Sequence, residues 1–369
     1  MASGYSLKDQ LFNRDKVRWL AGRFAALDGA EFEAAVMARL PELELKQRID
    51  WIARCLVERL PPELPEAAPH LLAALPPPLD PSRRDDDFGD FIIAPLGEAV
   101  VALGLEAHPE LSLDLLAELT QRFSMEYAIR PFLNRWPEIT LRRMAGWARH
   151  EHYHVRRLVS EGTRPRLPWG MGIGLDISAP LPLLDALHGD PARFVTRSVA
   201  NHLNDIAKKA PDLAMDQLAA WRAEARQEAA ELDWMTRHAL RGLVKEGHPR
   251  ALAMLGFAAG GDLDCRLDLG SDTLRIGDAL EITCELASPT AQPVLVDYVL
   301  HFARPDGKTR RKVFKLKQSV TVPGLPLVLA KRHPLKGDAT TFTLHPGRHR
   351  VELQVNGTVR AEAAFDLIP

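Results

Sequence analysis

The sequence predicts two structural classes in one chain, an all-α solenoid of HEAT-like helical repeats over residues 1–258 and an immunoglobulin-like β-sandwich over residues 264–369. Three observations lead to this prediction. A chain of 369 residues is longer than a typical single-core domain. Apolar residues recur at helical spacing up to about residue 257. Short segments with alternating apolar and polar residues follow.

The first part of the chain carries the pattern of short helices. Val17, Leu20, Phe24 and Leu27 lie three or four residues apart, which places them on one face of a helix. Proline clusters at residues 61–62 and 76–78 interrupt the pattern between helices. We therefore expect stacked helix pairs.

An internal repeat supports the solenoid. An aromatic residue followed three residues later by arginine recurs at spacings of 41 and 40 residues, in the pairs Tyr153/Arg156, Phe194/Arg197 and Trp234/Arg237. A period of about 40 residues is that of HEAT-type repeats. The alternative is chance recurrence of common residue types. If the repeat is structural, its arginines are expected to bridge layers of the solenoid.

The last part of the chain shows the alternation of half-buried strands. It is clearest in residues 274–286, 294–303 and 349–355, with turn signals such as Asn356-Gly357 between such segments. Cys265 and Cys284 are only 19 residues apart. We therefore expect an immunoglobulin-like sandwich without the long-range inter-sheet disulfide.

The charge of the chain gives mixed evidence about nucleic acid. A formal net charge of −2 argues weakly against a polyanionic partner. Nine arginines nevertheless fall between Arg130 and Arg166, where only three acidic residues oppose them. Such a run either binds phosphates or is an ordinary solvated face, and charge alone leaves both interpretations open.

The cysteines and the N-terminal segment indicate a cytoplasmic protein. Three scattered cysteines are too few for a disulfide framework or a regularly spaced zinc site. The N-terminal segment has no apolar signal-peptide core, and no stretch approaches the roughly 18 apolar residues needed to span a bilayer. We expect no membrane association.

No metal or cofactor site is predicted. The chain lacks a phosphate-cradling glycine loop and a nucleophile elbow. His150, His152 and His154 invite a metal interpretation. Side chains two residues apart on a helix point about 200° apart, however, so they cannot converge on one ion.

Four stretches resemble the AlkC family of DNA alkylation repair glycosylases, relatives of AlkD. They are SLKDQLFNRDKV, SMEYAIRPFL, HVRRLVSEGTRPRLPWG and RFVTRSVANHLNDIAKKAPD, of which SEGTRPRLPWG is the most specific. The resemblance spans most of residues 5–257. The C-terminal part resembles the AlkC subgroup that carries an added immunoglobulin-like module.

The resemblance implies a hydrolytic DNA glycosylase of base excision repair. Its partner would be double-stranded DNA containing 3-methyladenine or 3-methylcytosine, and it would need no metal or nucleotide cofactor and no obligatory protein partner. It also implies that a bent duplex is trapped without full flipping of the damaged base, unlike in the usual base-flipping glycosylases.

The chemistry of such a substrate points to carboxylates. N3-alkylation makes the base cationic and a good leaving group, so a strong general acid is unnecessary. What remains is to stabilise an oxocarbenium-like sugar and to position water, which carboxylates can do. Glu126, Glu161 and Asp205 are the predicted catalytic residues. Each lies four residues from a polar partner, respectively Arg130, Arg157 and Asn201. Ordinary i,i+4 helix support is the other interpretation of each pair.

Further residues are predicted to bind the substrate. Trp169 either stacks on the exposed sugar or base or fills a repeat junction in the core. Arg157, Arg164 and Arg166 are expected to contact phosphates, while Arg130 and Asn201 are expected at the site as polar partners. In the β-domain the basic strand that contains Lys312, Lys315 and Lys317 either contacts DNA or protects a sheet edge with charge.

The alternative to an enzyme is a helical-repeat scaffold that binds a protein partner, a common use of solenoids. A scaffold would spread its contacts along the concave surface. The clustering of arginines with Glu126, Glu161 and Trp169 in one stretch favours the glycosylase.

Overall fold

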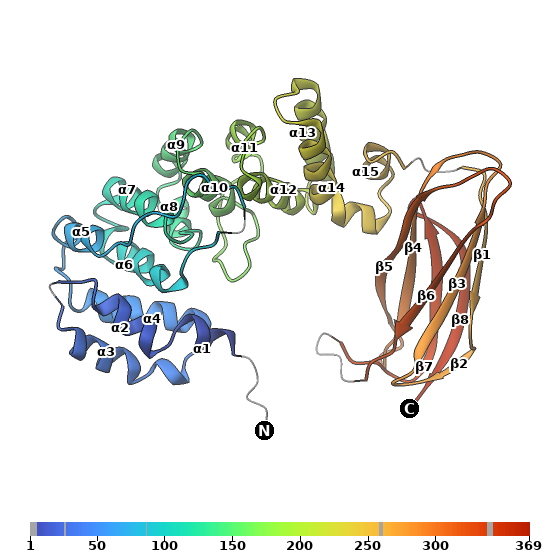
Figure 1. Ribbon diagram of the computed structural model, residues 1–369, viewed down its shortest axis with the longest axis horizontal. Coiled ribbons are helices and arrows are strands. Elements are labelled where there is room, and N and C mark those ends of the chain that lie inside the picture. Colours follow the sequence, from blue (N-terminus) through green and yellow to red (C-terminus); the bar gives the residue numbers. More distant parts are fainter. Residues whose placement is uncertain (1–5, 26, 86, 258–260, 338–341) are drawn as a thin grey trace. The chain divides into compact units, whose positions relative to one another are not determined.

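The computed structural model describes residues 6–25, 27–85, 87–257, 261–337 and 342–369, and the chain forms two compact units, Met1–Ala239 and Leu240–Pro369. The first unit is helical. The second contains the end of the last long helix, a short helix and two β-sheets (Figure 1). The predicted order of an all-α region followed by a β-sandwich is confirmed.

The helical unit consists of short helices that follow one another in sequence order (Figure 1). Proline occupies the first position of α7, α9 and α13, where its missing N–H has no intrahelical partner to lose. Glu44 and Gln47 form a capping box at the start of α4. The α-helices are α1 (Leu7–Leu11), α2 (Arg14–Ala21), α3 (Gly29–Met37), α4 (Leu45–Val57), α5 (Leu64–Ala73), α6 (Ala94–Gly104), α7 (Pro109–Thr120), α8 (Ile129–Arg135), α9 (Pro137–Trp147), α10 (Tyr153–Gly162), α11 (Leu181–Leu187), α12 (Arg193–Ala207), α13 (Pro211–Glu224), α14 (Ala229–Glu246) and α15 (Pro249–Met254).

Helices α10 and α12 pack against each other and carry polar residues into their interface. Leu158 of α10 and Leu203 of α12 are fully buried, as the helical spacing of the apolar residues predicts. Glu161 on α10 and Asp205 on α12 are each only 5% exposed. A buried carboxylate requires cationic or hydrogen-bonding partners. This interface is therefore the candidate location of a functional site.

The sequence repeat corresponds to a packing contact between these two helices. Tyr153 is the first residue of α10, and Phe194 lies in the first turn of α12. Their ring centroids are 5.9 Å apart, with the rings nearly perpendicular. The aromatic residues of two successive repeats therefore pack on each other.

The arginines of the repeat behave differently from copy to copy. Arg156 donates to Asp190 and Arg197 pairs with Asp85, so both arginines bridge segments distant in sequence, as expected. Arg237 is exposed and has no side-chain hydrogen bond or ion pair with any described residue. The predicted bridge is wrong for this third copy, because its guanidinium group faces solvent.

The second unit contains two packed sheets. The three-stranded sheet has the order β1-β3-β6 and the five-stranded sheet β2-β8-β7-β4-β5. Only β2 and β8 are parallel among the pairs within these sheets. The strands are β1 (Asp264–Leu269), β2 (Thr273–Arg275), β3 (Ala279–Ala287), β4 (Pro293–Ala303), β5 (Thr309–Val320), β6 (Leu327–Pro334), β7 (Gly347–Val355) and β8 (Thr358–Ile368).

The core of the sandwich follows from alternation along its strands. Ile282, Cys284 and Leu286 of β3 are buried at every second position and pack in one cluster with residues of β4. Cys265 and Cys284 are free and belong to the same sheet, so they cannot form an inter-sheet disulfide. This agrees with the prediction of a sandwich without that bond.

The boundary between the two compact units falls between Ala239 and Leu240, earlier in the chain than the expected boundary between residues 258 and 264. Leu252 and Phe257 form a small buried cluster with Leu295 of β4. Gly247, at φ +80°, lies so close to Gly357 that a Cβ atom would be 2.8 Å from the Gly357 carbonyl oxygen. The end of α14 and all of α15 therefore belong with the sandwich. Residue 258 itself lies outside the described residues.

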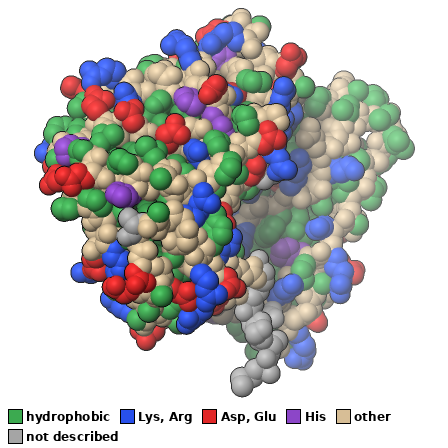
Figure 2. All heavy atoms as spheres, turned by 60° about the vertical axis from the view of Figure 1, so that its left-hand side comes forward, with side chains coloured by type: hydrophobic (Ala, Val, Ile, Leu, Met, Phe, Trp, Pro, Cys, Tyr) green, Lys and Arg blue, Asp and Glu red, His purple; other side chains and the backbone are tan. Residues whose placement is uncertain are grey.

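The surface is mixed in charge. Figure 2 shows basic and acidic side chains interspersed over the helical unit, without one sign covering the whole face in view. This matches the formal net charge of −2. No helix in the described part of the chain is long and apolar enough to cross a membrane.

Candidate active site

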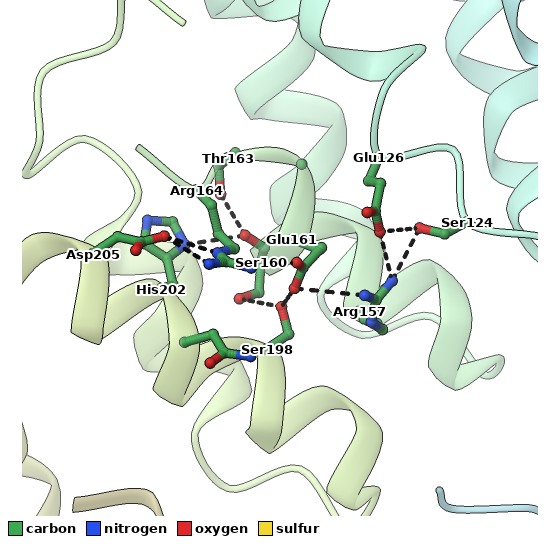
Figure 3. Close-up of polar contacts among 12 residues, drawn as sticks. Ser124, Glu126, Arg157, Ser160, Glu161, Thr163, Arg164, Ser198, His202 and Asp205 are labelled. Carbon is green, nitrogen blue, oxygen red and sulfur yellow. Dashed lines mark hydrogen bonds and ion pairs between the residues drawn. The ribbon is translucent and has the colours of Figure 1, made fainter. Parts of the chain in front are cut away.

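The three predicted carboxylates lie in one chain of ion pairs held by α10, α12 and the turn before α8 (Figure 3). Arg157 joins Glu126 to Glu161, and Arg164 joins Glu161 to Asp205. Acids and arginines thus alternate along the cluster. The structure brings together residues that are up to 79 positions apart in the sequence.

Glu161 is the central acid of the cluster. Arg164 Nη1 donates to its Oε1 at 2.6 Å, and Ser198 Oγ donates to its Oε2 at 2.6 Å. Arg157 Nη2 lies 3.6 Å from the same Oε2, which confirms the contact expected from their i,i+4 spacing. Burial acts to raise the pKa of Glu161, but Arg157 and Arg164 outweigh it and hold the pKa below its ordinary value. The carboxylate is therefore ionised at neutral pH.

Asp205 closes the cluster on α12. Arg164 Nε and Nη2 both lie 2.9 Å from Asp205 Oδ2, and Lys208 Nζ donates to Oδ1 at 3.1 Å. The Asp205 side chain is 4% exposed. Both of its oxygens are thus occupied by cationic donors.

Glu126 is the most exposed of the three carboxylates, with 16% of its side chain accessible. Ser124 Oγ and Arg157 Nη1 donate to Glu126 Oε2 at 2.7 and 3.0 Å. Glu126 Oε1 has no hydrogen bond with any described residue. The expected Glu126–Arg130 helix pair is wrong: Glu126 lies in the turn that precedes α8, so the two side chains do not share a helix face.

Arg130 holds a loop instead of a carboxylate. The residue is 1% exposed, and its Nη1 donates to the carbonyl oxygens of Gly162 and Arg164 at 2.9 and 3.0 Å. Its Nε donates to the carbonyl oxygen of Met171 at 2.5 Å. Arg130 thereby fixes the segment between α10 and α11 that carries Arg164, Arg166 and Trp169.

The expected phosphate contacts separate into two groups. The side chains of Arg157 and Arg164 are only 12% and 11% exposed and are paired with carboxylates, so in this arrangement neither guanidinium group is free to bind a phosphate. Arg157 also stacks on the ring of Phe194, at 4.5 Å from its centroid. Arg166 is exposed and forms no side-chain hydrogen bond or ion pair with the described residues. It remains available to a phosphate.

Trp169 is on the surface. It is 65% exposed and has φ of 61°, an unusual conformation for a bulky residue. Its carbonyl oxygen accepts a hydrogen bond from Lys46 Nζ at 3.3 Å. The alternative of a core tryptophan at a repeat junction is therefore wrong, and the ring is free to contact a ligand.

Asn201 lies on α12 one turn before Asp205, as predicted. Its side-chain oxygen accepts a hydrogen bond from His238 Nε2 of α14 at 2.8 Å. The His238 ring stacks on Trp234 with a centroid distance of 4.9 Å. Asn201 thus connects α12 to α14.

The lysines of β5 do not share one face. Lys312 and Phe314 lie opposite Leu300 and Tyr298 of the core, whereas Lys315 lies opposite Asp297 and points to the other face. The register shifts between Lys315 and Lys317, so Lys317 lies opposite the core residue Val296 and does not share the face of Lys315. Lys312 Nζ lies 3.3 Å from the centroid of the Phe342 ring. Lys315 and Lys317 are exposed on an edge strand.

Sequence reasoning missed the hydroxyl groups of the site. Ser198 binds Glu161, and Ser124 accepts a hydrogen bond from Arg157 Nη1 at 3.0 Å. Ser198 lies on α12, two turns before Asp205 and on the same helix face, which is the signal that could have identified it. His202, between them, is fully buried, and burial lowers its pKa to about 4, so it is neutral.

No group of three or more His, Cys, Asp or Glu side chains in the described ranges is arranged to hold a metal ion. Arginine guanidinium groups neutralise the clustered carboxylates instead. The arrangement can stabilise a positive charge near Glu126 and can bind a water molecule at its free oxygen.

Comparisons with known proteins identify the family of the chain. Residues 264–369 match the family model described as "Uncharacterised protein YhaZ, C-terminal Ig-like domain". The uncharacterized protein YhaZ of Bacillus subtilis is 33% identical over 332 residues, which cover 89% of this chain and 88% of that protein. The second unit, which contains both sheets, is thus immunoglobulin-like, as predicted.

A solved structure matches the whole chain. The Pseudomonas fluorescens alkylpurine DNA glycosylase AlkC, bound to DNA containing an abasic site analog, superposes with a TM-score of 0.87 at 31% identity. The match covers 99% of this chain and 100% of that one. Sequence motifs, fold and the three comparisons agree, and this chain belongs to the AlkC family, in the subgroup with a C-terminal immunoglobulin-like domain.

Proposed function

We propose that this protein is a DNA glycosylase of base excision repair that hydrolyses the N-glycosidic bond of cationic alkylated bases in duplex DNA. The substrates are 3-methyladenine and 3-methylcytosine. The observation that carries the proposal is the buried alternation of three carboxylates and two arginines, which suits an electron-deficient sugar. The alkylpurine glycosylase activity of the similar AlkC structure supports the substrate class.

Glu126 is the carboxylate that acts on the substrate. It is the most exposed of the three, and its Oε1 has no hydrogen bond with any described residue, so this oxygen can orient a water molecule or face the anomeric carbon. Because the base already carries a positive charge before the bond breaks, no proton donor is required. As the glycosidic bond breaks, its electron pair passes to the base, which departs neutral, while water bonds to the anomeric carbon and gives up a proton to Glu126.

Glu161 and Asp205 stabilise the cationic sugar electrostatically and position the arginines. Both oxygens of each acid are already bonded, so neither is free to orient water without rearrangement. Glu161 is held ionised by Arg157 and Arg164, which keeps negative charge in the site throughout the reaction. Low accessibility around these groups strengthens their field.

Binding to DNA uses the exposed residues near the cluster. Trp169 stacks on the sugar or base at the lesion, and Arg166 contacts a backbone phosphate. In the second unit, Lys315 and Lys317 offer a basic sheet edge to a phosphate backbone, whereas Lys312 stays against Phe342. Asn201 supports the site through His238.

The proposal includes a damaged base that is not fully flipped into a deep pocket, as the family resemblance implies. It also places the protein in the cytoplasm of its cell. Both statements concern how the enzyme encounters its substrate, and neither changes the proposed roles of the carboxylates.

The deciding experiment is a single-turnover incubation with methylated duplex DNA in the presence of EDTA, followed by chromatography of the released bases. We expect 3-methyladenine and 3-methylcytosine to be released. A folded preparation that binds duplex DNA but releases neither base would contradict the proposal and favour a binding scaffold.

A further inference from the structure

A surface depression lies beside α10, on a different face from the active-site carboxylates. It is a cavity of about 850 Å³ lined by residues of α10, of the segment before η2 (Phe91–Ile93) and of the segment between α11 and α12. Arg156 lines this cavity, whereas the next residue, Arg157, belongs to the active site. Consecutive residues on a helix point about 100° apart. None of the three described active-site acids lines the cavity.

The walls of this cavity are strongly basic. Five arginines line it against two acidic residues, Glu151 and Asp190. Asp190 is already neutralised by Arg156, whose Nε donates to Asp190 Oδ2 at 2.5 Å. A surplus of positive charge therefore faces the open space.

Two of the arginines are unoccupied. Arg84 and Arg149 are exposed, and neither side chain forms a hydrogen bond or ion pair within the described part of the chain. This differs from Arg156, which is paired, and from Arg226, which donates to Glu224 and to the carbonyl oxygen of Asp185. Free guanidinium groups are preorganised donors for phosphate oxygens.

A buried hydroxyl supplies independent evidence for a ligand. Tyr153 lines the same cavity and is 1% exposed, yet its hydroxyl has no hydrogen-bond partner. An unsatisfied buried hydroxyl is unfavourable and calls for an unseen partner. The ring is fixed by stacking on His152 and by edge contact with Phe194, so the hydroxyl cannot simply turn to solvent.

The depression extends beyond this cavity. A second cavity of about 840 Å³ shares five of its lining residues, including Arg84, Asp190 and Arg226, and continues to Arg193 of α12. The two cavities form an elongated depression, but they differ in charge, because three arginines line the second cavity against four acidic residues, Asp85, Asp190, Glu228 and Glu231. The surplus of positive charge is therefore confined to the first cavity, which is the part that suits a phosphate.

We propose that the first, basic cavity of this depression binds backbone phosphates of a DNA strand, with Arg84 and Arg149 as the charged contacts and the Tyr153 hydroxyl as a neutral donor. The inference rests on the proposed function, because it adds a strand-binding surface to a DNA glycosylase. Phosphate is the chemistry recognised, and free phosphate is the other possible source of it.

The test uses the full chain with Arg84→Ala and Arg149→Ala combined. Affinity for an undamaged duplex is measured by fluorescence anisotropy over a series of salt concentrations. Each lost phosphate contact lowers the slope of log K against log salt by about 0.9, so we expect a decrease of about 2 and at least tenfold weaker binding at low salt. The matched control combines Arg142→Ala with Arg222→Ala, which removes two exposed arginines of α9 and α13 outside the depression.

Tyr153→Phe tests the hydroxyl separately, since it retains the ring. We expect about tenfold weaker duplex binding with an unchanged melting temperature, as for loss of a hydrogen bond to a charged group. Wild-type affinity in this variant would remove the hydroxyl from the site.

The outcomes separate this inference from the proposed function. An unchanged salt slope in the Arg84/Arg149 double variant overturns the inference even if base release is normal. Absence of base release from wild-type protein contradicts the proposed glycosylase function. The salt slope measured with undamaged DNA still decides whether the depression binds backbone phosphates. If calorimetry shows that the double variant loses binding of inorganic phosphate but keeps the duplex slope, the depression serves free phosphate and the DNA assignment is wrong.

Discussion

Arg164 and Asp205 form a two-donor ion pair, in which Nε and Nη2 of the arginine each lie 2.9 Å from Oδ2 of the aspartate. The remaining Nη1 binds Glu161 at 2.6 Å. One guanidinium group therefore neutralises two buried acids that belong to different helices. Its removal leaves both carboxylates with fewer cationic partners in an environment that excludes water.

Arg164→Met should destabilise the helical unit by about 3–5 kcal/mol, the effect of removing one partner from a buried ion pair. Urea unfolding followed by circular dichroism measures the change. The double variant Arg164→Met/Asp205→Asn should recover part of the loss, because the second substitution removes one unpaired charge. A loss below about 1 kcal/mol in the single variant would show that the pair is not buried in solution.

Glu126→Gln should reduce single-turnover base release by about 100-fold, the effect of losing one preorganised electrostatic group. Duplex affinity should change little, because Glu126 carries negative charge and does not attract phosphate. Glu138→Gln, an exposed acid in the first turn of α9, is the control. Equal rates for the two variants would exclude Glu126 from the chemistry.

Trp169→Ala should weaken binding of lesion-containing duplex by about 1–3 kcal/mol, the contribution of one stacked aromatic. The melting temperature should hardly change, since the ring is 65% exposed and contributes little to the core. Trp169→Phe should restore most of the affinity. If Trp169→Ala binds as wild type does, the tryptophan has no stacking role.

Glu161→Gln should alter the pH dependence of stability in the acid range. Its pKa is lowered in the folded protein, so the ionised carboxylate contributes stability above the unfolded pKa, and this contribution is lost as the pH falls through the folded value. The difference in unfolding free energy between wild type and variant should thus be constant near neutral pH and shrink in the acid range. A difference that grows on acidification would give the opposite sign to the pKa shift.

His154→Phe should flatten the decline of stability between pH 6.5 and pH 4. Burial lowers the pKa of His154 from 6.5 to about 3, so the unfolded chain binds a proton in this interval that the folded chain does not. Wild-type stability must therefore rise with pH there. Phenylalanine keeps the aromatic contact with Phe194 and removes the titration. Identical pH profiles for the two proteins would show that His154 does not titrate in this way.

Much of the fold follows from local pattern, and the site follows only in part. Helical spacing and strand alternation are properties of short segments, and the repeat is the recurrence of one short motif at spacings of 41 and 40 residues, so the sequence reveals all three directly. The pairing of Arg157 with Glu161 was predictable for the same reason, because both lie on α10. The link from Arg164 to Asp205 spans 41 residues and depends on the packing of α10 on α12, which no spacing rule contains.

Glu126 shows how a spacing rule fails. The i,i+4 argument assumes that both residues lie in one helix, but α8 begins at Ile129. Pro131 gives a signal for this, because proline is tolerated in the first turn of a helix and breaks its interior. A helix that begins just before Pro131 excludes Glu126, which is then free to reach Arg157.

The grip of Arg130 on the carbonyl groups of Gly162, Arg164 and Met171 bears on how such an enzyme would search a genome. The segment that presents Arg166 and Trp169 takes its shape when the protein folds, and it does not wait for DNA to arrive. Each encounter with an undamaged site then proceeds without the conformational entropy loss of ordering a loop. A rigid DNA-contacting segment is thereby compatible with rapid sampling of many DNA sites.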